Sequence, residues 1–150
     1  MELKKTDKYM LEAINEAYKG IKQGHGGPFG AVLVQKGKIV AKAHNTVLRD
    51  NDATCHAEMH VIRNGSKKLK RFDLSDCELY TTGKPCPMCK SAIQWAKIKN
   101  VYYGCDYNDA KAIGFVEKAG NSKSYKEKKI CSKECKELYS EYKKLKLPRY

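Results

Sequence analysis

Three residues with the chemistry of zinc ligands constrain the fold of this chain more than any other feature: His56, Cys86 and Cys89. One imidazole and two sulfurs suit zinc, and three protein ligands leave the fourth position of a tetrahedral site open for water. About 30 residues separate His56 from the cysteines, so two distant segments must meet at one point. The pattern therefore predicts a fold organised around a solvent-accessible zinc ion.

A carboxylate, Glu58, lies two residues after the histidine, and Pro85 precedes the first cysteine. The arrangement H-x-E followed by P-C-x-x-C is the signature of zinc-dependent nucleobase deaminases. In that chemistry zinc lowers the pKa of water towards about 7, and the glutamate carries protons to a ring nitrogen and to the departing amine. We therefore expect one Zn²⁺ per chain and Glu58 as the catalytic residue.

Each half of this pattern is weak when it occurs alone. C-x-x-C is also found in redox motifs and in closed structural zinc sites, and H-x-E arises by chance on surface helices. The order of the halves, the gap between them and the proline together favour the catalytic interpretation. The alternative is a zinc-stabilised binding module without catalysis, which requires a fourth protein ligand on the metal.

Local rules place both halves of the motif at helix starts. The proline before the first cysteine suits the first turn of a helix because it has no N–H, so both sulfurs are expected in that turn, facing one point. Asp52 or Thr54 is expected to cap a second helix that carries His56. Two helix N-termini then converge on the zinc.

The length and composition limit the class of protein. With 150 residues and no apolar run long enough to cross a membrane, the chain is expected to be a single domain over residues 1–150. Its N-terminus lacks the apolar segment of a secretory signal, so we expect a cytoplasmic protein. The seven cysteines are an odd number, and a disulfide framework is not expected in a reducing compartment.

The cysteines outside the motif have simpler interpretations. Cys55, Cys77 and Cys105 are expected to be small core residues. Cys131 and Cys135 lie four residues apart on an expected helix, where they either bridge a second metal or bury one helical face. Burial is favoured because no partner histidine or cysteine follows them.

The formal net charge of +13 raises nucleic acid as a partner. Most of the basic residues are lysines, whereas the planar guanidinium of arginine is better suited to phosphate and base recognition. Over residues 123–149 the lysines are mixed with glutamates, as on a solvated surface. Nucleic acid is therefore not the expected partner, although RNA stays an alternative.

The pattern of apolar residues predicts an alternation of helices and strands. Helices are expected over residues 6–22, 55–68, 86–98, 109–114 and 132–146, and strands over 29–35, 38–44, 77–82, 100–105 and 128–130. Such alternation favours parallel pairing with both faces covered. We predict an α/β protein, a three-layer α/β/α sandwich around a mixed sheet of about five strands, with the zinc at the end of the sheet.

With these residues in view, the chain resembles the cytidine deaminase superfamily, most closely the small bacterial guanine deaminases. The resemblance covers nearly the full length, and it is carried by residues 26–32, Asn45, 51–52, 56–58, 85–89, 93–96, 114–115 and Tyr150. It implies that Asn45 hydrogen-bonds the bound base, that Phe29 and Trp95 wall the base pocket, and that Ala57 contacts the substrate. The plainer alternatives are a turn residue for Asn45 and ordinary core packing for the aromatic rings.

The resemblance also implies a homodimer in which the C-terminal segment, about 132–150, is exchanged between subunits. Tyr150 then closes the active site of the neighbouring subunit. The competing expectation for a terminal tyrosine is fraying into solvent.

Two positions depart from the family pattern. Lys84 stands where the family usually has a glutamate, one residue before the proline-cysteine pair. Val116 and Glu117 stand where it usually has two aspartates, the second of which contacts guanine. Glu117 keeps a carboxylate for the guanine N1–H and 2-amino group, with one extra methylene that shifts it by more than about 1 Å.

The leading functional hypothesis is deamination of the small-molecule nucleobase guanine to xanthine and ammonia. A cytosine or other amino-heterocycle deaminase is the next alternative, since the same zinc apparatus serves pyrimidines. tRNA adenosine deamination is the third, and it predicts dependence on RNA and steep loss of affinity with salt.

Overall fold

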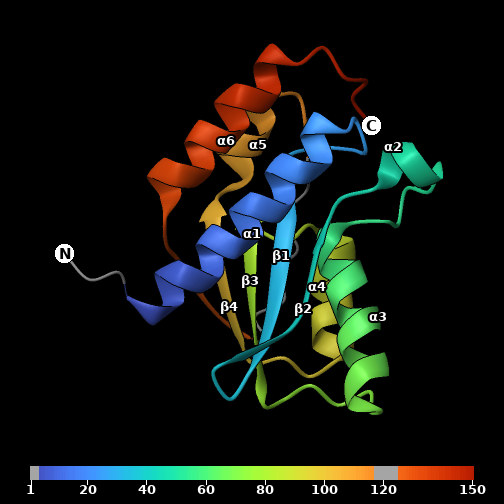
Figure 1. The fold of residues 1–150 in the computed structure, drawn as a ribbon, viewed down its shortest axis with the longest axis vertical. Coiled ribbons are helices and arrows are strands. Elements are labelled where there is room, and N and C mark those ends of the chain that lie inside the picture. The colour runs from blue at the N-terminus through green and yellow to red at the C-terminus, as the bar shows by residue number, and fades with distance from the viewer. Residues whose placement is uncertain (1–3, 117–124) are drawn as a thin grey trace.

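The structure is a computed structural model that describes residues 4–116 and 125–150. Its elements in chain order are α1 (Lys5–Lys22), β1 (Gly30–Gln35), β2 (Lys38–His44), α2 (Val47–Asp50), α3 (Ala57–Leu69), β3 (Cys77–Gly83), α4 (Pro87–Trp95), β4 (Asn100–Cys105), α5 (Tyr107–Ala112), β5 (Lys126–Lys129) and α6 (Ser132–Lys144) (Figure 1). The predicted alternation of helices and strands is confirmed, and the short helix α2 is an addition to it.

The five strands form one mixed sheet in the order β2-β1-β3-β4-β5. β1 pairs antiparallel with β2 and with β3, whereas β3, β4 and β5 are parallel. The β1–β2 connection turns at Lys36 and Gly37, both with positive φ, as a tight hairpin turn requires. The parallel strands β3 and β4 are joined through α4, so the start of that helix lies at one end of the sheet.

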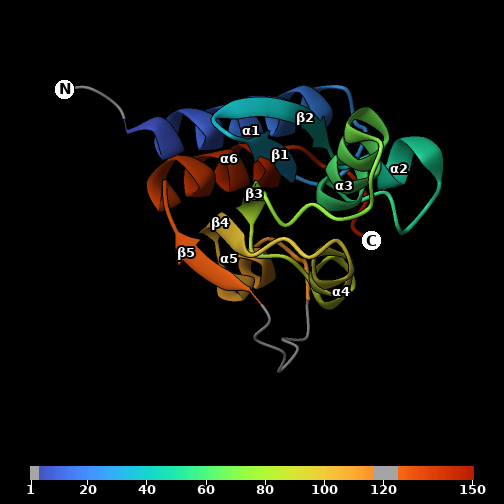
Figure 2. The ribbon, with the colours of Figure 1, turned by 90° about the horizontal axis from the view of Figure 1, so that it is seen from below.

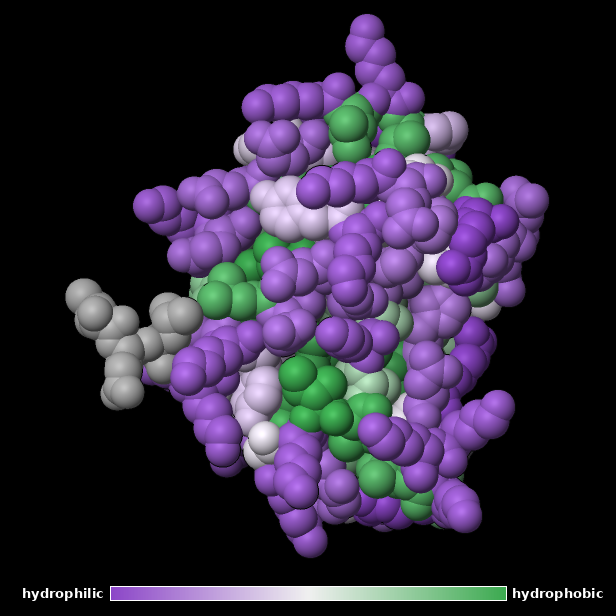
Figure 3. All heavy atoms as spheres, viewed as in Figure 1, coloured by the Kyte–Doolittle hydropathy of each residue, from purple (hydrophilic) through white to green (hydrophobic). Residues whose placement is uncertain are grey.

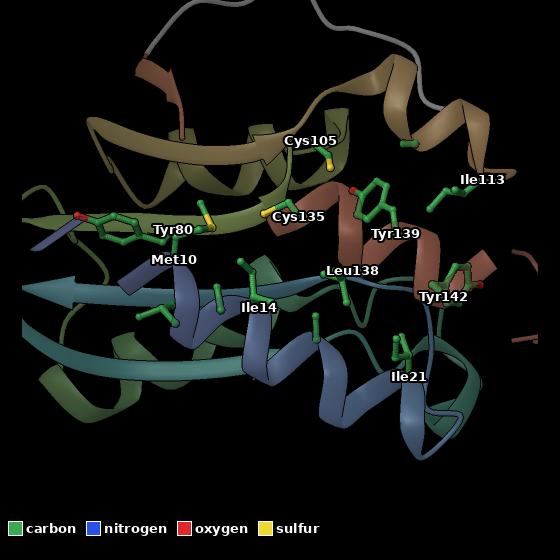
Figure 4. Packing of buried hydrophobic residues seen from close by; sticks show 14 of the residues in the cluster. Met10, Ile14, Ile21, Tyr80, Cys105, Ile113, Cys135, Leu138, Tyr139 and Tyr142 are labelled. Carbon is green, nitrogen blue, oxygen red and sulfur yellow. The ribbon is translucent and has the colours of Figure 1, made fainter. Parts of the chain in front are cut away.

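Side chains alternate between two apolar layers along the inner strand β1. Val32 and Val34 point into a cluster with α1, α5 and α6, while Ala31 and Leu33 point into a cluster with α3 and α4. Figure 2 shows the sheet between these two groups of helices, and Figure 4 shows the packing of the first cluster. The three-layer α/β/α architecture is thus confirmed.

The edge strand β5 carries four exposed residues, of which three are lysines. The sequence predicts this strand two residues later, at 128–130, because such a polar segment has no apolar alternation. Charged side chains on an edge strand oppose pairing with another chain, which suits its position. Hydrophilic side chains cover most of the face in Figure 3, with small hydrophobic areas between them.

None of the described helices is long and apolar enough to cross a membrane.

Candidate active site

The three expected zinc ligands meet at one end of the sheet. The Nδ1 atom of His56 lies 3.6 Å from Sγ of Cys86 and 3.5 Å from Sγ of Cys89. Ligands about 2.1–2.3 Å from a tetrahedral zinc are separated by edges of roughly 3.5–3.8 Å, so the donor set fits this ion. Within residues 4–116 and 125–150, the cluster around this point contains these three ligand side chains.

Both ligand segments lie at helix starts, although not through the caps that the sequence predicts. His56 itself is the N-cap of α3, with extended backbone and no side-chain cap. The carboxylate of Asp52 instead accepts hydrogen bonds from the backbone N–H and hydroxyl of Thr54, at 2.8 and 2.7 Å. The capping prediction is therefore wrong, because this short Asx turn uses the carboxylate before the helix begins.

The second helix start is shifted by two residues. Cys86 is the N-cap of α4, and Pro87, rather than Pro85, occupies its first turn. The carbonyl of Pro85 accepts a hydrogen bond from the hydroxyl of Tyr107, which ties the cysteine loop to α5. The two sulfurs remain one helical turn apart on one side of the helix, so they face the imidazole as predicted.

Glu58 lies in the first turn of α3 and is 5% exposed. Burial raises the pKa of this carboxyl group to about 7. Hydrogen bonding from Cys89, and then from His56, lowers the pKa of the Cys86 thiol to about 4, which favours the thiolate that binds metal. A carboxyl group with a pKa near neutrality is suited both to take and to give a proton.

A cavity of about 360 Å³ opens beside the zinc ligands. Its lining includes the following residues: Phe29, Ala53, His56, Glu58, Gly83, Lys84, Cys86, Pro87, Met88, Phe115, Val116 and Tyr150. The rings of Phe29 and Phe115 meet edge to face with centroids 5.1 Å apart, and Phe115 and Tyr150 are 5.2 Å apart. These three rings give the cavity an aromatic wall next to a buried carboxyl group.

Tyr150 is held at the cavity of its own chain. Its hydroxyl accepts a hydrogen bond of 3.1 Å from the backbone N–H of Gly27. Arg149 anchors the tail, because it donates to the carbonyl of Ile113 at 2.9 Å and lies over the ring of Tyr142 at 4.3 Å. The expected contact with a neighbouring subunit stays a prediction, and fraying does not describe this tail. The C-terminus lies near α2 in both views (Figures 1 and 2).

Asn45 follows β2 and is fully buried. Its Oδ1 accepts a hydrogen bond of 3.0 Å from the backbone N–H of Val47, while its Nδ2 has no hydrogen-bond partner among the described residues. A side chain at Gly26 would collide with this Oδ1, so glycine is required there. An unpaired buried donor is costly, and a bound ligand with an acceptor relieves that cost. Asn45 does not itself line the cavity surface.

Trp95 does not line the cavity of its own chain, so its role in walling the base pocket stays a prediction. It is 83% exposed at the last residue of α4, whereas the cavity touches the first turn of that helix. Phe115 supplies the second aromatic ring instead, because the turn after α5 carries it over Phe29. Ala57 is fully buried in the apolar layer under α3 and does not line the cavity.

Lys84 lines the cavity, and its charge is balanced from another strand. Its Nζ lies 3.3 Å from a carboxylate oxygen of Glu127 on β5, and over the rings of Tyr107 and Tyr103 at 5.1 and 5.5 Å. The charge of Lys84 is thus partnered within this chain by a carboxylate and two aromatic rings. Glu117 lies outside the described residues, so its predicted contact with guanine stays a prediction.

The remaining cysteines are free thiols. Cys55, Cys77 and Cys105 are buried, as expected of small core residues. Cys135 is fully buried on the inner face of α6, in agreement with the burial interpretation, whereas Cys131, the N-cap of that helix, is only partly buried.

Comparisons with known proteins agree with this site. Residues 3–105 match the cytidine and deoxycytidylate deaminase zinc-binding region. Guanine deaminase of Bacillus subtilis is 46% identical over 107 residues, which span 71% of this chain and 69% of that enzyme. Its X-ray structure matches with a TM-score of 0.72 at 34% identity, over 96% of this chain and 97% of that one.

Two further proteins extend the comparison. The structure of guanine deaminase from Nitrosomonas europaea matches with a TM-score of 0.85 over 91% of this chain and 84% of that one; at 24% identity this likeness establishes the fold. A tRNA-specific adenosine deaminase of Buchnera aphidicola is 33% identical over 146 residues, covering 95% of this chain and 96% of that protein.

The match to the zinc-binding region covers more than half of the chain, and the three ligands and the glutamate lie in the positions that the signature requires. The chain belongs to the cytidine and deoxycytidylate deaminase family. It is a zinc-dependent hydrolytic deaminase with a cytidine deaminase-like α/β fold.

Proposed function

We propose that the substrate is a free nucleobase, guanine, and that the products are xanthine and ammonia. The observation that carries the proposal is the cavity, in which a buried carboxyl group and two of the three zinc ligands, His56 and Cys86, lie opposite an aromatic wall. Flat rings of this kind suit a planar heterocycle. The 46% identity to a guanine deaminase favours guanine among such heterocycles.

The side chains divide the chemistry between them. His56, Cys86 and Cys89 hold zinc, which when bound supplies the Lewis acidity that makes water nucleophilic at neutral pH. Glu58 takes a proton from the attacking water, delivers it to a ring nitrogen of guanine, and transfers a second proton to the amine on C2. Water adds to C2 and the C–N bond to the amine breaks, so guanine and water become xanthine and ammonia.

The remaining residues orient the base. We assign the unpaired Nδ2 of Asn45 as a donor to a carbonyl of the base, which gives that buried group its missing acceptor. Phe29, Phe115 and Tyr150 hold the ring plane. We retain Glu117 as the acceptor for guanine N1–H and the 2-amino group, and a Glu117→Gln variant tests that role through KM for guanine.

Glu58→Gln tests the proton-transfer role. The variant should bind one zinc per chain and lose deamination by about 100-fold or more, because general acid–base catalysis contributes roughly 10²–10⁴-fold. Glu12→Gln is the matched control, since Glu12 is an exposed carboxylate paired with Lys42. Full activity in Glu58→Gln would end the assignment.

Ammonia release from guanine, cytosine, adenine, adenosine and tRNA tests the substrate. Turnover of guanine without RNA supports the proposal, and turnover of another base without guanine refutes it. tRNA adenosine deamination is the second candidate, because a tRNA-specific relative aligns over 95% of this chain and the net charge is +13. A steep loss of activity with salt, seen with tRNA alone, would favour it.

We further propose a cytoplasmic homodimer that does not use nucleic acid as a partner. The seven free thiols suit a reducing compartment. Exchange of residues 132–150 between subunits is tested by mixing a Glu58→Gln subunit with one that lacks Tyr150. Restored activity requires that a tail from one subunit completes the site of the other, and no restoration refutes the exchange.

A further inference from the structure

A second cluster of ligand-type side chains lies next to the catalytic one along the chain. It consists of Asp50 at the end of α2, Cys55, and His60 on α3, whose ligand atoms lie within 4.8 Å of one another. None of the three lines the substrate cavity. Cys55 and His56 are consecutive, and each belongs to a different cluster. The family signature involves only the second of them.

A buried hydroxyl completes this cluster. Thr46 is 3% exposed, and its Oγ1 lies 2.7 Å from Oδ2 of Asp50 and 2.7 Å from Nε2 of His60. One sulfur, one imidazole nitrogen, one carboxylate oxygen and one hydroxyl oxygen therefore converge within a small volume. Cys55 and Thr46 are buried, so the inner half of the cluster is shielded from solvent.

The donor types select the kind of ligand. Thiolate and imidazole favour borderline divalent ions such as Zn²⁺ and Co²⁺ over Mg²⁺ or Ca²⁺, which prefer six or more oxygens. A carboxylate and a thiolate balance the two positive charges. The present distances of 2.7 Å around the hydroxyl need to open by less than about 1 Å to become edges of a tetrahedron around such an ion.

We propose that Asp50, Cys55 and His60, with the hydroxyl of Thr46, form a second site for a divalent ion of the Zn²⁺ or Co²⁺ class. On binding, the thiol of Cys55 releases its proton to solvent and the sulfur bonds the metal. The ion fastens α2 to the start of α3, the segment that carries His56. This role is structural and separate from catalysis.

The charges around each cluster determine which of the two sites binds a metal ion first. Arg49 pairs with Asp50 from the solvent side, with Nε 2.8 Å from Oδ1 and Nη2 3.2 Å from Oδ2. This positive charge opposes a cation, whereas the catalytic cluster has two thiolate ligands. The second site therefore fills after the catalytic one and binds more weakly.

The test uses the zinc-loaded chain, to which Co²⁺ is added before unbound metal is removed by gel filtration. The expected result is one Co²⁺ per chain with zinc still at one per chain, and with thiolate-to-cobalt charge-transfer and tetrahedral d–d absorption. Cys55→Ser should abolish the charge-transfer band, and His60→Gln should weaken binding at least tenfold. Cys77→Ser is the matched control, a buried thiol outside both clusters, and should retain the wild-type spectrum.

Added Zn²⁺ supplies a second readout that does not depend on colour. It should raise the melting temperature of the zinc-loaded wild type and of Cys77→Ser, and leave those of Cys55→Ser and His60→Gln unchanged. Binding of no cobalt overturns the proposal. Cobalt bands that grow only as zinc is lost also overturn it, because the cobalt then occupies the catalytic site. Bands that persist in Cys55→Ser overturn it too, because the cobalt is then not bound by Cys55.

Discussion

The catalytic cluster of His56, Cys86 and Cys89 can be compared with the second cluster, here called the Thr46 cluster, of Asp50, Cys55, His60 and Thr46. The two contain similar side chains and are built in different ways. His56, Cys86 and Cys89 come from two helix starts that the sheet holds together across about 30 residues, and His56 and Cys86 line a cavity that also contains a buried carboxyl group. The second cluster comes from residues 46–60 alone, and its side chains do not line the cavity at the catalytic cluster. Ligand side chains that lie close together make a metal site, whereas catalysis also needs an accessible position, a proton carrier and space for substrate.

The largest expected effect belongs to the catalytic cluster. Cys86→Ser replaces one of three metal ligands, so the chain should lose its tightly bound zinc and its deamination rate should fall by about 10³-fold or more. Metal content by mass spectrometry and ammonia release measure both. Cys55→Ser should keep the catalytic zinc, and equal loss of zinc in the two variants would erase the distinction between the clusters.

The next effect concerns stability. Thr46→Val removes the two hydrogen bonds by which the buried Thr46 hydroxyl joins the exposed Asp50 to the partly buried His60, so the free energy of unfolding should fall by about 1–3 kcal/mol. Urea unfolding of the zinc-loaded chain measures this change. Thr54→Val, at an exposed threonine, should cost less than about 0.5 kcal/mol. Equal decreases in the free energy of unfolding in the two variants would show that the Thr46 cluster does not stabilise residues 46–60.

The smallest expected effect, a change in stability with pH, concerns a third cluster that contains histidines and no cysteine. His25 and His44 approach at 2.9 Å, and Nδ1 of His44 lies 3.5 Å from Glu16. Burial lowers the pKa of His44 below its ordinary value of 6.5, with Glu16 acting in the opposite direction. The unfolded chain therefore binds the extra proton first, so stability is present above about pH 6.5 and falls as the pH decreases through the folded value.

Melting temperatures between pH 8 and pH 5.5 test this linkage. Glu58, whose carboxyl pKa is raised to about 7, gains stability towards the acidic end in both proteins, so the test is the difference between them. From pH 8 to pH 5.5 the melting temperature of the wild type should fall more, or rise less, than that of His44→Gln. Burial also lowers the pKa of His60, so part of the slope should remain. An unchanged slope in His44→Gln would assign the pH dependence to other groups.

Much of the architecture follows from local sequence. The apolar periodicity of α1 and the continuous apolar run of β1 are local patterns, and they place these elements within a residue or two of their observed bounds. The polar edge strand β5 and the helix α2 are placed poorly or not at all, because neither has an apolar period to detect. The ion pair that balances the charge of Lys84 could not be predicted locally, because its partner, Glu127, lies on another strand.

By itself the sequence predicted the cluster of zinc ligands, the glutamate that we propose carries protons, and the α/β alternation, because a metal site demands particular residue types at particular spacings. Only the tertiary structure decided that Phe115 rather than Trp95 faces the cavity, that Asn45 has a buried donor without a partner among the described residues, and that Cys55 adjoins Asp50 and His60. The physical reason is that the surroundings of a side chain are set by packing between distant segments, which local periodicity does not encode.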